Sequence, residues 1–137
     1  MSKKTVLFIC THNSARSQMA EGLTNNLYKD KLRAFSAGTE QTKVKKFAVE
    51  AMKEIDIDIS NQYSKTIDKF KNRRFDYVVT VCNNAKKNCP FFPGAKKYFH
   101  APFKDPSNVA GNYKEKLKAF IETRRKINKW IKNNLIE

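Results

Sequence analysis

The residues with the clearest chemical potential lie near the start of the chain, where five residues separate Cys10 from Arg16. Backbone N–H groups in such a loop can converge on an oxyanion, and the arginine guanidinium can grip two of its oxygens. The same positive field favours the thiolate form of the cysteine and makes it a nucleophile. The spacing predicts an oxyanion site in residues 10–16, the anion loop. The alternative is an inert buried thiol beside a solvated arginine.

We expect the loop and the residue that follows it to surround the oxyanion together with the cysteine. The predicted oxyanion-binding residues are Thr11, His12, Asn13, Ser14, Ala15, Arg16 and Ser17. Ser17 could also donate a hydrogen bond to the sulfur of Cys10.

Apolar runs with the composition of strands alternate along the chain with stretches of helical periodicity. Strands are predicted over residues 5–10, 32–37, 75–82 and 96–100. Helices are predicted over residues 17–28, 43–55 and 113–131, with a short helical segment ending at Phe70.

Strands that alternate with helices imply right-handed crossovers and a parallel sheet covered on both faces, which is an α/β three-layer sandwich. A chain of 137 residues is too short for two cores, so we expect a single domain over residues 1–137. Ligands of such sheets bind beyond the carboxyl ends of the strands. Cys10, Cys82 and Asp105 end or follow three predicted strands and should gather at that edge.

The chain is strongly basic, because lysine and arginine outnumber aspartate and glutamate by 28 to 13 and give a net charge of +15. Nucleic acid is the first anionic partner to consider. The basic residues are spread from Lys3 to Lys132, however, and no nucleic-acid motif accompanies them. We therefore expect a solvated basic surface rather than a nucleic-acid interface.

The composition favours a cytoplasmic protein with no membrane association. No apolar run approaches the roughly 20 residues that span a bilayer, and residues 1–4 lead into no signal segment. The odd number of cysteines, Cys10, Cys82 and Cys89, favours reactive thiols or a metal site over a secreted disulfide framework. The cysteines and the two histidines lack the short paired spacing of zinc ligands, so no metal is predicted.

The segment from Cys10 to Gly22 resembles the active-site signature of the low-molecular-weight protein tyrosine phosphatase family, in its thioredoxin-coupled arsenate reductase branch. The resemblance extends over essentially the whole chain, and its other matching segments are residues 36–38, 51–54, 58–60, 78–82, 89–90 and 105–106. It implies a four-stranded parallel sheet in the order 2-1-3-4, no tightly bound cofactor and a monomer.

Two residues of the anion loop depart from the branch. Ala15 stands where some relatives carry an additional cysteine, and His12 stands where glycine is usual. The His12 side chain could alter the loop or point to solvent, and we expect the second.

The resemblance implies one set of catalytic residues and two reactions. Cys10 is the nucleophile, Arg16 the oxyanion clamp and Asp105 the general acid. In a reductase, Cys10 attacks arsenate, Cys82 attacks Cys10 and releases arsenite, and Cys89 attacks Cys82. Thioredoxin then reduces the resulting disulfide. Phosphate and sulfate would compete with arsenate for the loop.

Two other functions are compatible with the same residues. A phosphatase of the same fold would form a phosphocysteine on Cys10 and hydrolyse it with water, without need of Cys82 or Cys89. A basic binding module without chemistry is the third possibility, although the nucleophile, the clamp and the acid are all present.

The resemblance also places a potassium site beside the anion loop, held by residues that match Asn13, Glu21 and Ser36, with an acidic residue near position 65. This chain has Lys65 there. Our hypothesis is that the Lys65 ammonium occupies the cation position and pairs with Glu21. The alternative is a solvent-exposed Lys65.

Overall fold

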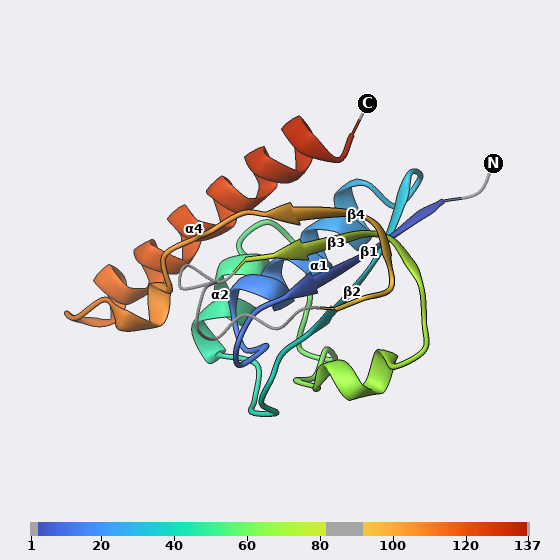
Figure 1. The fold of residues 1–137 in the computed structure, drawn as a ribbon. Helices are drawn as coiled ribbons and strands as arrows, with labels where there is room; N and C mark the ends of the chain where they lie inside the picture. The colour runs from blue at the N-terminus through green and yellow to red at the C-terminus, as the bar shows by residue number, and fades with distance from the viewer. Residues whose placement is uncertain (1–2, 82–91, 137) are drawn as a thin grey trace.

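A parallel four-stranded sheet forms the centre of the molecule (Figure 1). The structure is a computed structural model that describes residues 3–81 and 92–136. The strands are β1 (Lys4–Ile9), β2 (Leu32–Ala37), β3 (Phe75–Thr80) and β4 (Ala95–His100). Their order across the sheet is β2-β1-β3-β4, with parallel pairing throughout. The predicted order and direction are confirmed.

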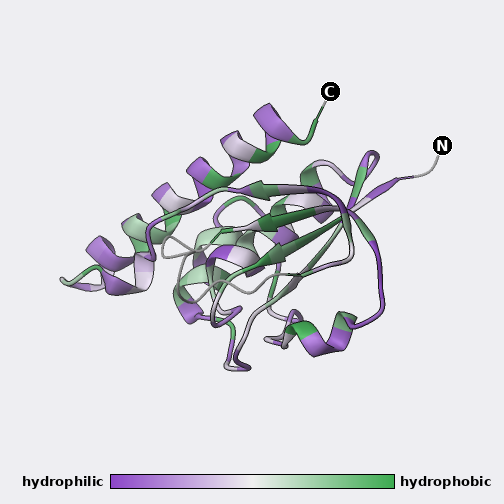
Figure 2. Cartoon of the chain, in the orientation of Figure 1, coloured by the Kyte–Doolittle hydropathy of each residue, from purple (hydrophilic) through white to green (hydrophobic). Residues whose placement is uncertain are grey.

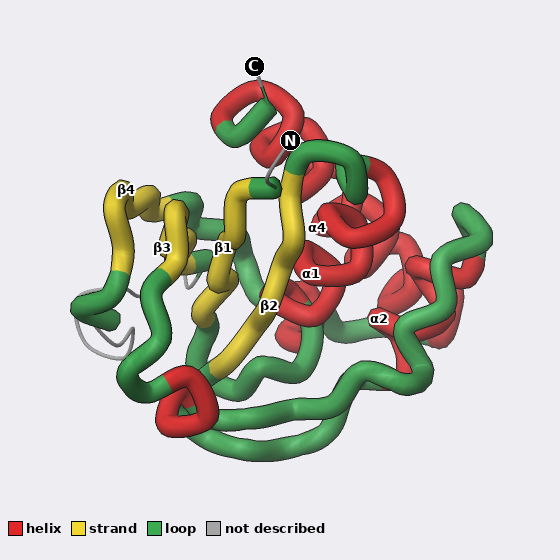
Figure 3. The backbone as a smooth tube through the Cα atoms, turned by 90° about the vertical axis from the view of Figure 1, so that its right-hand side faces the viewer, coloured by secondary structure: helices red, strands yellow, loops and turns green. Residues whose placement is uncertain are grey.

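Helical segments lie on both faces of this sheet. The helices α1 (Arg16–Leu27), α2 (Lys46–Lys53) and α4 (Tyr113–Asn134) gather on one side in Figure 3. The short 3-10 helix η1 (Ile67–Phe70) packs through Phe70 into the apolar cluster on the other face. A second 3-10 helix, η2 (Pro106–Asn108), follows β4. The three layers predicted from the alternation of strands and helices are present.

Strand β1 occupies the middle of the core because its side chains are apolar on both faces. Val6 and Phe8 belong to the large cluster beneath the helices, whereas Leu7 and Ile9 belong to the cluster on the opposite face. All four are fully buried. A strand buried on both sides needs a continuous apolar run rather than an alternating one, which the sequence provides. Figure 2 shows the same concentration of hydrophobic residues along the central strands.

The predicted boundaries differ from the observed ones where long-range contacts decide them. Helix α2 begins at Lys46 rather than at position 43. The backbone of Lys45 is extended, with ψ of 137°, and its N–H donates to the carbonyl of Ser14 in the anion loop. The described part of β3 ends at Thr80, and the predicted end of that strand at Cys82 lies outside the described residues.

A carboxylate at the amino-terminal end of the sheet ties β3 to β1. The Oδ2 atom of Asp76 accepts from the backbone N–H of Thr5 at 2.8 Å. This hydrogen bond is the main cause that lowers the pKa of Asp76 below its ordinary value of 3.8, and Lys96 adds a smaller contribution.

Asp76→Asn should therefore destabilise the protein at neutral pH but not in acid. A lowered folded pKa means that the carboxylate stabilises the fold above its unfolded pKa and loses this effect as the pH falls through the folded pKa. We expect the free energy of unfolding to drop by about 1 kcal/mol at neutral pH. Urea unfolding of both proteins from neutral pH down to pH ~3 tests this, since the two stability curves should converge in acid. Curves that stay parallel would contradict it.

Within residues 3–81 and 92–136, no helix combines the length and the apolar character needed to cross a membrane.

Candidate active site

The anion loop connects the carboxyl end of β1 to the first turn of α1. Strand β1 pairs with β2 on one side and with β3 on the other, so the strand order reverses at this point. Ligands of open parallel sheets bind at such a reversal, beyond the carboxyl ends of the strands. Topology alone therefore puts Cys10 where a ligand should lie.

Residues outside the anion loop donate hydrogen bonds to its backbone carbonyl groups. The carbonyl of Thr11 accepts from the backbone N–H groups of Thr39 and Glu40, at 2.9 and 3.1 Å. The carbonyl of His12 accepts from the Ser64 hydroxyl at 3.0 Å. Each carbonyl of a trans peptide points opposite to the next N–H, so these bonds turn the following N–H groups toward the inside of the loop.

The next two carbonyl groups are held in the same way. The carbonyl of Asn13 accepts from the Gln18 side chain at 3.0 Å, and that of Ser14 accepts from the Lys45 N–H at 2.8 Å. Four successive carbonyl groups thus have partners outside the loop. The spacing of Cys10 and Arg16 predicts that the amide groups between these carbonyls face a bound oxyanion.

Asn13 adopts the left-handed conformation, with φ of 49°, that bends the loop. Its Oδ1 accepts from the Lys65 N–H at 3.0 Å and from the Gln18 amide at 2.9 Å, while its Nδ2 donates to the Ser17 hydroxyl at 2.8 Å. Asparagine tolerates this backbone region better than most residues, and three bonds to a fully buried side chain fix it there. Asn13 therefore fixes the bend of the loop and links it to Lys65, Gln18 and Ser17.

Cys10, the predicted nucleophile, lies beside the hydroxyl group of Ser17. The Cys10 sulfur lies 2.9 Å from the Ser17 hydroxyl, and both residues are buried. Because that hydroxyl already accepts from Asn13, its own hydrogen is free to point at the sulfur. A hydrogen bond of this kind favours the thiolate over the thiol.

The predicted clamp and the predicted acid, Arg16 and Asp105, lie next to each other on the other side of the loop. The Arg16 guanidinium donates to the Phe103 carbonyl at 3.0 Å through one terminal nitrogen, and the other lies 3.6 Å from Oδ2 of Asp105. The Ser107 N–H donates to Oδ1 of Asp105 at 2.9 Å. The fold thus brings Asp105 beside Arg16, although the two residues lie far apart in the sequence. Cys82 and Cys89 lie outside the described residues.

Lys65 is buried beside the loop and faces three oxygen atoms. Its ammonium lies 3.6 Å from Oε1 of Glu21, and it donates to the Tyr63 carbonyl at 2.9 Å and to the Ser36 hydroxyl at 3.4 Å. The Ser36 hydroxyl in turn donates to Oε1 of Glu21. The ammonium contacts the oxygens of Glu21 and Ser36, and the Lys65 backbone N–H binds Asn13, so Lys65 engages all three residues that the resemblance assigns to a potassium ion. A solvent-exposed Lys65, the alternative interpretation, is wrong.

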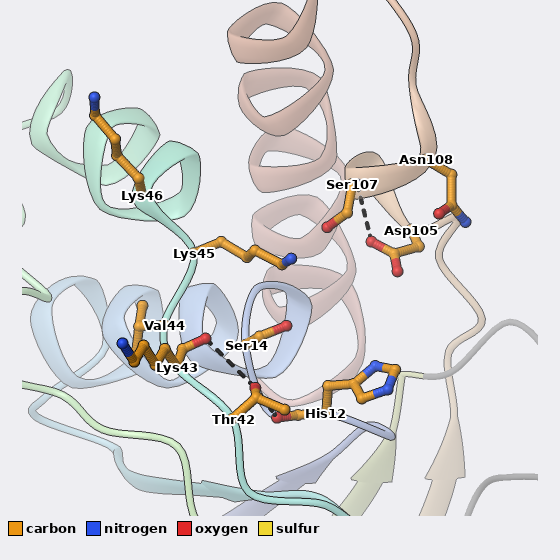
Figure 4. Close-up of a pocket in the computed structure, with 10 residues that line it drawn as sticks. All are labelled: His12, Ser14, Thr42, Lys43, Val44, Lys45, Lys46, Asp105, Ser107 and Asn108. Atoms are coloured by element: carbon orange, nitrogen blue, oxygen red, sulfur yellow. Dashed lines mark hydrogen bonds between the residues drawn. The ribbon is translucent and has the colours of Figure 1, made fainter.

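His12 and a basic groove form the entrance to the loop. The His12 ring is half-exposed and pairs with Glu40 at 3.1 Å, so the expected orientation toward solvent is observed. A groove of about 660 Å³ runs past it between the anion loop, residues 42–46 and η2 (Figure 4). Asp105, the predicted acid, lines the same groove together with Ser14 of the anion loop.

Sequence patterns missed two residues that build the loop from outside. Gln18 is fully buried in α1 and binds both the carbonyl and the side chain of Asn13. Ser64 donates to the His12 carbonyl and accepts from the Thr42 N–H at 2.8 Å. Gln18 could have been found as a polar residue on the apolar side of a helix. Ser64 offers no comparable signal.

Gly38 packs against the back of the anion loop so closely that a side chain has no room. A Cβ atom there would lie 2.6 Å from the Thr11 carbonyl oxygen, 2.8 Å from that of Cys10 and 2.9 Å from the Asn13 nitrogen. All three are backbone atoms of the loop, so the loop itself would have to move.

Gly38→Ala adds only one methyl group, but it should displace the backbone of the anion loop and so lower both stability and oxyanion binding. We expect a loss of about 1–3 kcal/mol in the free energy of unfolding, together with weaker oxyanion binding. Gly22→Ala is the matched control, because the nearest atoms there belong to flexible side chains, of which Ile59 lies at 2.6 Å. Urea unfolding and protection of Cys10 from alkylation by phosphate measure both effects. Phosphate binding that survives Gly38→Ala and is lost in Gly22→Ala would refute this assignment.

Among the residues that the structure describes, no group of three or more histidine, cysteine, aspartate and glutamate residues could hold a metal ion.

Comparison with known proteins agrees with this geometry. The family model for low molecular weight phosphotyrosine protein phosphatase matches residues 5–135. An arsenate reductase from Oceanobacillus iheyensis is 44% identical over 132 residues, which cover 96% of this chain and 95% of that protein.

Two solved structures extend the comparison. An arsenate reductase in the phosphate binding state is 31% identical with a TM-score of 0.81, and the match covers 97% of this chain and 96% of that chain. A thioredoxin-dependent arsenate reductase from Corynebacterium glutamicum is 27% identical with a TM-score of 0.63, covering 96% of this chain and 63% of that chain. Anion loop, sheet order and sequence similarity agree, and this chain belongs to the low molecular weight phosphotyrosine protein phosphatase family.

Proposed function

We propose that this protein reduces arsenate to arsenite through a relay of Cys10, Cys82 and Cys89, and that thioredoxin regenerates it. The observation that carries the proposal is a buried cysteine sulfur at the start of a loop in which four successive carbonyl groups are bonded from outside, in a chain 44% identical to an arsenate reductase. Arsenate and phosphate are nearly isosteric, and a related structure is described as an arsenate reductase that binds phosphate.

In the first step, the Cys10 thiolate attacks arsenic while Arg16 and the loop amides hold the other oxygens. A sulfur–arsenic bond forms and an arsenic–oxygen bond breaks. Asp105, which lies 3.6 Å from Arg16, gives a proton to the departing oxygen, which leaves as water. The Ser17 hydroxyl supports the thiolate before the attack.

The second and third steps move the oxidising equivalent away from the loop. The Cys82 thiolate attacks the Cys10 sulfur, so a disulfide forms, the sulfur–arsenic bond breaks and its electron pair stays on arsenic as arsenite. Cys89 then attacks Cys82 and frees Cys10. Val81, the last described residue before Cys82, donates its N–H to the Ile9 carbonyl at 2.8 Å, which supports a short path between the two thiols.

The proposed electron donor follows from this scheme and from one relative. A Cys82–Cys89 disulfide needs a dithiol reductant, and the relative from Corynebacterium glutamicum is described as thioredoxin-dependent. The cytoplasm, where thioredoxin keeps thiols reduced, is the proposed location, and a monomer suffices for the reaction.

A phosphatase is the second candidate function, and one observation favours it. Cys10, Arg16 and Asp105 complete the machinery for a phosphocysteine intermediate without any further thiol, and the matching family model is that of a phosphatase.

Arsenate-dependent oxidation of NADPH, coupled through thioredoxin and its reductase, separates the two candidates when aryl phosphate hydrolysis is followed in parallel. We expect arsenate turnover that depends on thioredoxin, and we expect the phosphatase activity to be weak. Efficient aryl phosphate hydrolysis without arsenate turnover would make this protein a phosphatase.

We further propose that the Lys65 ammonium makes the enzyme independent of potassium, because it pairs with Glu21 and Ser36. Wild-type turnover should be equal in potassium and sodium salts of the same ionic strength. Lys65→Ser, which removes the ammonium and leaves oxygen atoms in its place, should turn over faster in potassium than in sodium. Strong activation of the wild type by potassium alone would disprove the replacement.

A further inference from the structure

The start of α2 carries positive charge where a helix is least able to tolerate it. Lys45 is the N-cap residue, its side chain makes no capping hydrogen bond, and Lys43 and Lys46 flank it. Helix N-termini prefer serine, threonine, aspartate or asparagine at the cap, and the helix dipole repels cations there. Because Lys45 does not stabilise the start of α2, its presence there suggests a functional role.

Lys45 is anchored directly to the anion loop. Its N–H donates to the Ser14 carbonyl at 2.8 Å. Its own carbonyl accepts from the N–H groups of Ala48 and Val49 in the first turn of α2, at 3.0 and 3.1 Å. The backbone of Lys45 is therefore fixed on both sides, and its side chain starts from a defined place relative to the oxyanion site.

The side chains of the neighbouring lysines take different directions. In Figure 4 the Lys45 chain runs across the groove toward Ser107 and Asp105, passing above Ser14, whereas the Lys46 chain points away from them. Only one of these two adjacent cations is thus directed at the entrance of the anion loop. Lys46 can therefore serve as a control for Lys45, because the two side chains carry the same charge but point in different directions.

The groove lining suits a small anion better than an aromatic ester. Its described lining contains three lysines and one carboxylate, Asp105, and it holds no phenylalanine, tyrosine or tryptophan. Val44 is its one apolar side chain among the described lining residues. An aryl phosphate carries the same double charge as inorganic phosphate, but its ring would also need an apolar wall, and this groove presents the charged Lys45 chain there instead. A free dianion needs only the positive charge.

We propose that Lys45 is a specificity-determining residue that draws doubly charged inorganic oxyanions into the anion loop and disfavours aryl phosphate esters. The inference rests on the proposed function, since it names the substrate class of the same site. Its side chain is directed at the entrance, so its ammonium adds to the attraction that Arg16 exerts deeper in the loop.

Binding of inorganic phosphate tests this without relying on arsenate turnover. Phosphate and phenyl phosphate are titrated separately as protectants of Cys10 against iodoacetamide, with the Cys10 peptide followed by mass spectrometry. We expect Lys45→Gln to weaken phosphate about 3- to 10-fold and to flatten its dependence on ionic strength. Phenyl phosphate loses the same attraction, but its ring no longer has to lie beside an ammonium, so its binding should weaken less and the preference for phosphate should shrink. Lys46→Gln should change both anions less than about 2-fold.

A third variant separates recognition from folding. Lys45→Asn places a preferred capping residue at the start of α2, so its Tm should equal or exceed that of the wild type while phosphate binding weakens as in Lys45→Gln. Equal effects of Lys45→Gln and Lys46→Gln on phosphate would overturn the proposal, and so would unchanged binding in both Lys45 variants. A wild type that binds phosphate but never reduces arsenate would refute the proposed function while leaving this inference standing.

Discussion

Cys10→Ser is expected to lower kcat/KM for arsenate by at least about 10⁴-fold, to the limit of detection. A serine hydroxyl at this position stays protonated near neutral pH, and it cannot form the disulfide that carries electrons to arsenic. The side chain is almost fully buried and keeps its shape in the variant, so the fold should survive. Steady-state turnover with thioredoxin, together with thermal unfolding, measures both consequences.

Ser17→Ala should have a smaller effect than Cys10→Ser. It removes the hydroxyl 2.9 Å from the sulfur but leaves the sulfur in place, so we expect a loss of about 10-fold in kcat/KM that shrinks as the pH rises. Arsenate turnover that persists in Cys10→Ser would show that another thiol makes the first attack, and the proposed order of the relay would fall.

Arg16→Lys should cost about 10²- to 10³-fold in kcat/KM for arsenate although the positive charge is retained. The guanidinium uses one terminal nitrogen on the Phe103 carbonyl and directs the other at Asp105. A lysine ammonium is a point charge that cannot reproduce this fork or grip two oxygens of the anion in one plane. The largest part of the loss should fall in kcat, because the charge on those oxygens is redistributed during the attack.

Arg124→Lys is the matched control for this substitution. Arg124 is buried to a similar degree in α4, where one nitrogen donates to the Ala51 carbonyl at 2.6 Å and to Glu54 at 2.8 Å. The same chemical change should therefore lower the free energy of unfolding without altering kcat/KM. A similar kinetic loss in both variants would mean that Arg16 acts through stability rather than through the anion.

The sequence predicted the parts of the site that local patterns encode. The spacing of Cys10 and Arg16 between a buried strand and a helix marks the anion loop, and alternation of strands and helices brings Asp105 to the same edge. Local periodicity could not reveal Gly38, since its need for empty space arises from the backbone of a segment distant in sequence.

The start of α2 could not be predicted from local sequence either. Residues 43–45 have helical spacing, yet the Lys45 N–H binds Ser14 instead of extending the helix. Only the folded contact between two loops decides that boundary. The pairing of Lys65 with Glu21 was accessible as a hypothesis because the substituted charge was visible in the sequence, whereas its burial needed the structure.

A single turnover in the absence of any reductant tests the relay most directly. Fully reduced protein in excess is mixed with arsenate, arsenite is counted per arsenate supplied, and the disulfides are mapped by peptide mass spectrometry. The account predicts one arsenite per arsenate and a Cys82–Cys89 disulfide in the wild type. In Cys89→Ser it predicts one arsenite and a trapped Cys10–Cys82 disulfide. No arsenite and no disulfide, or arsenite that forms without Cys82, would contradict it.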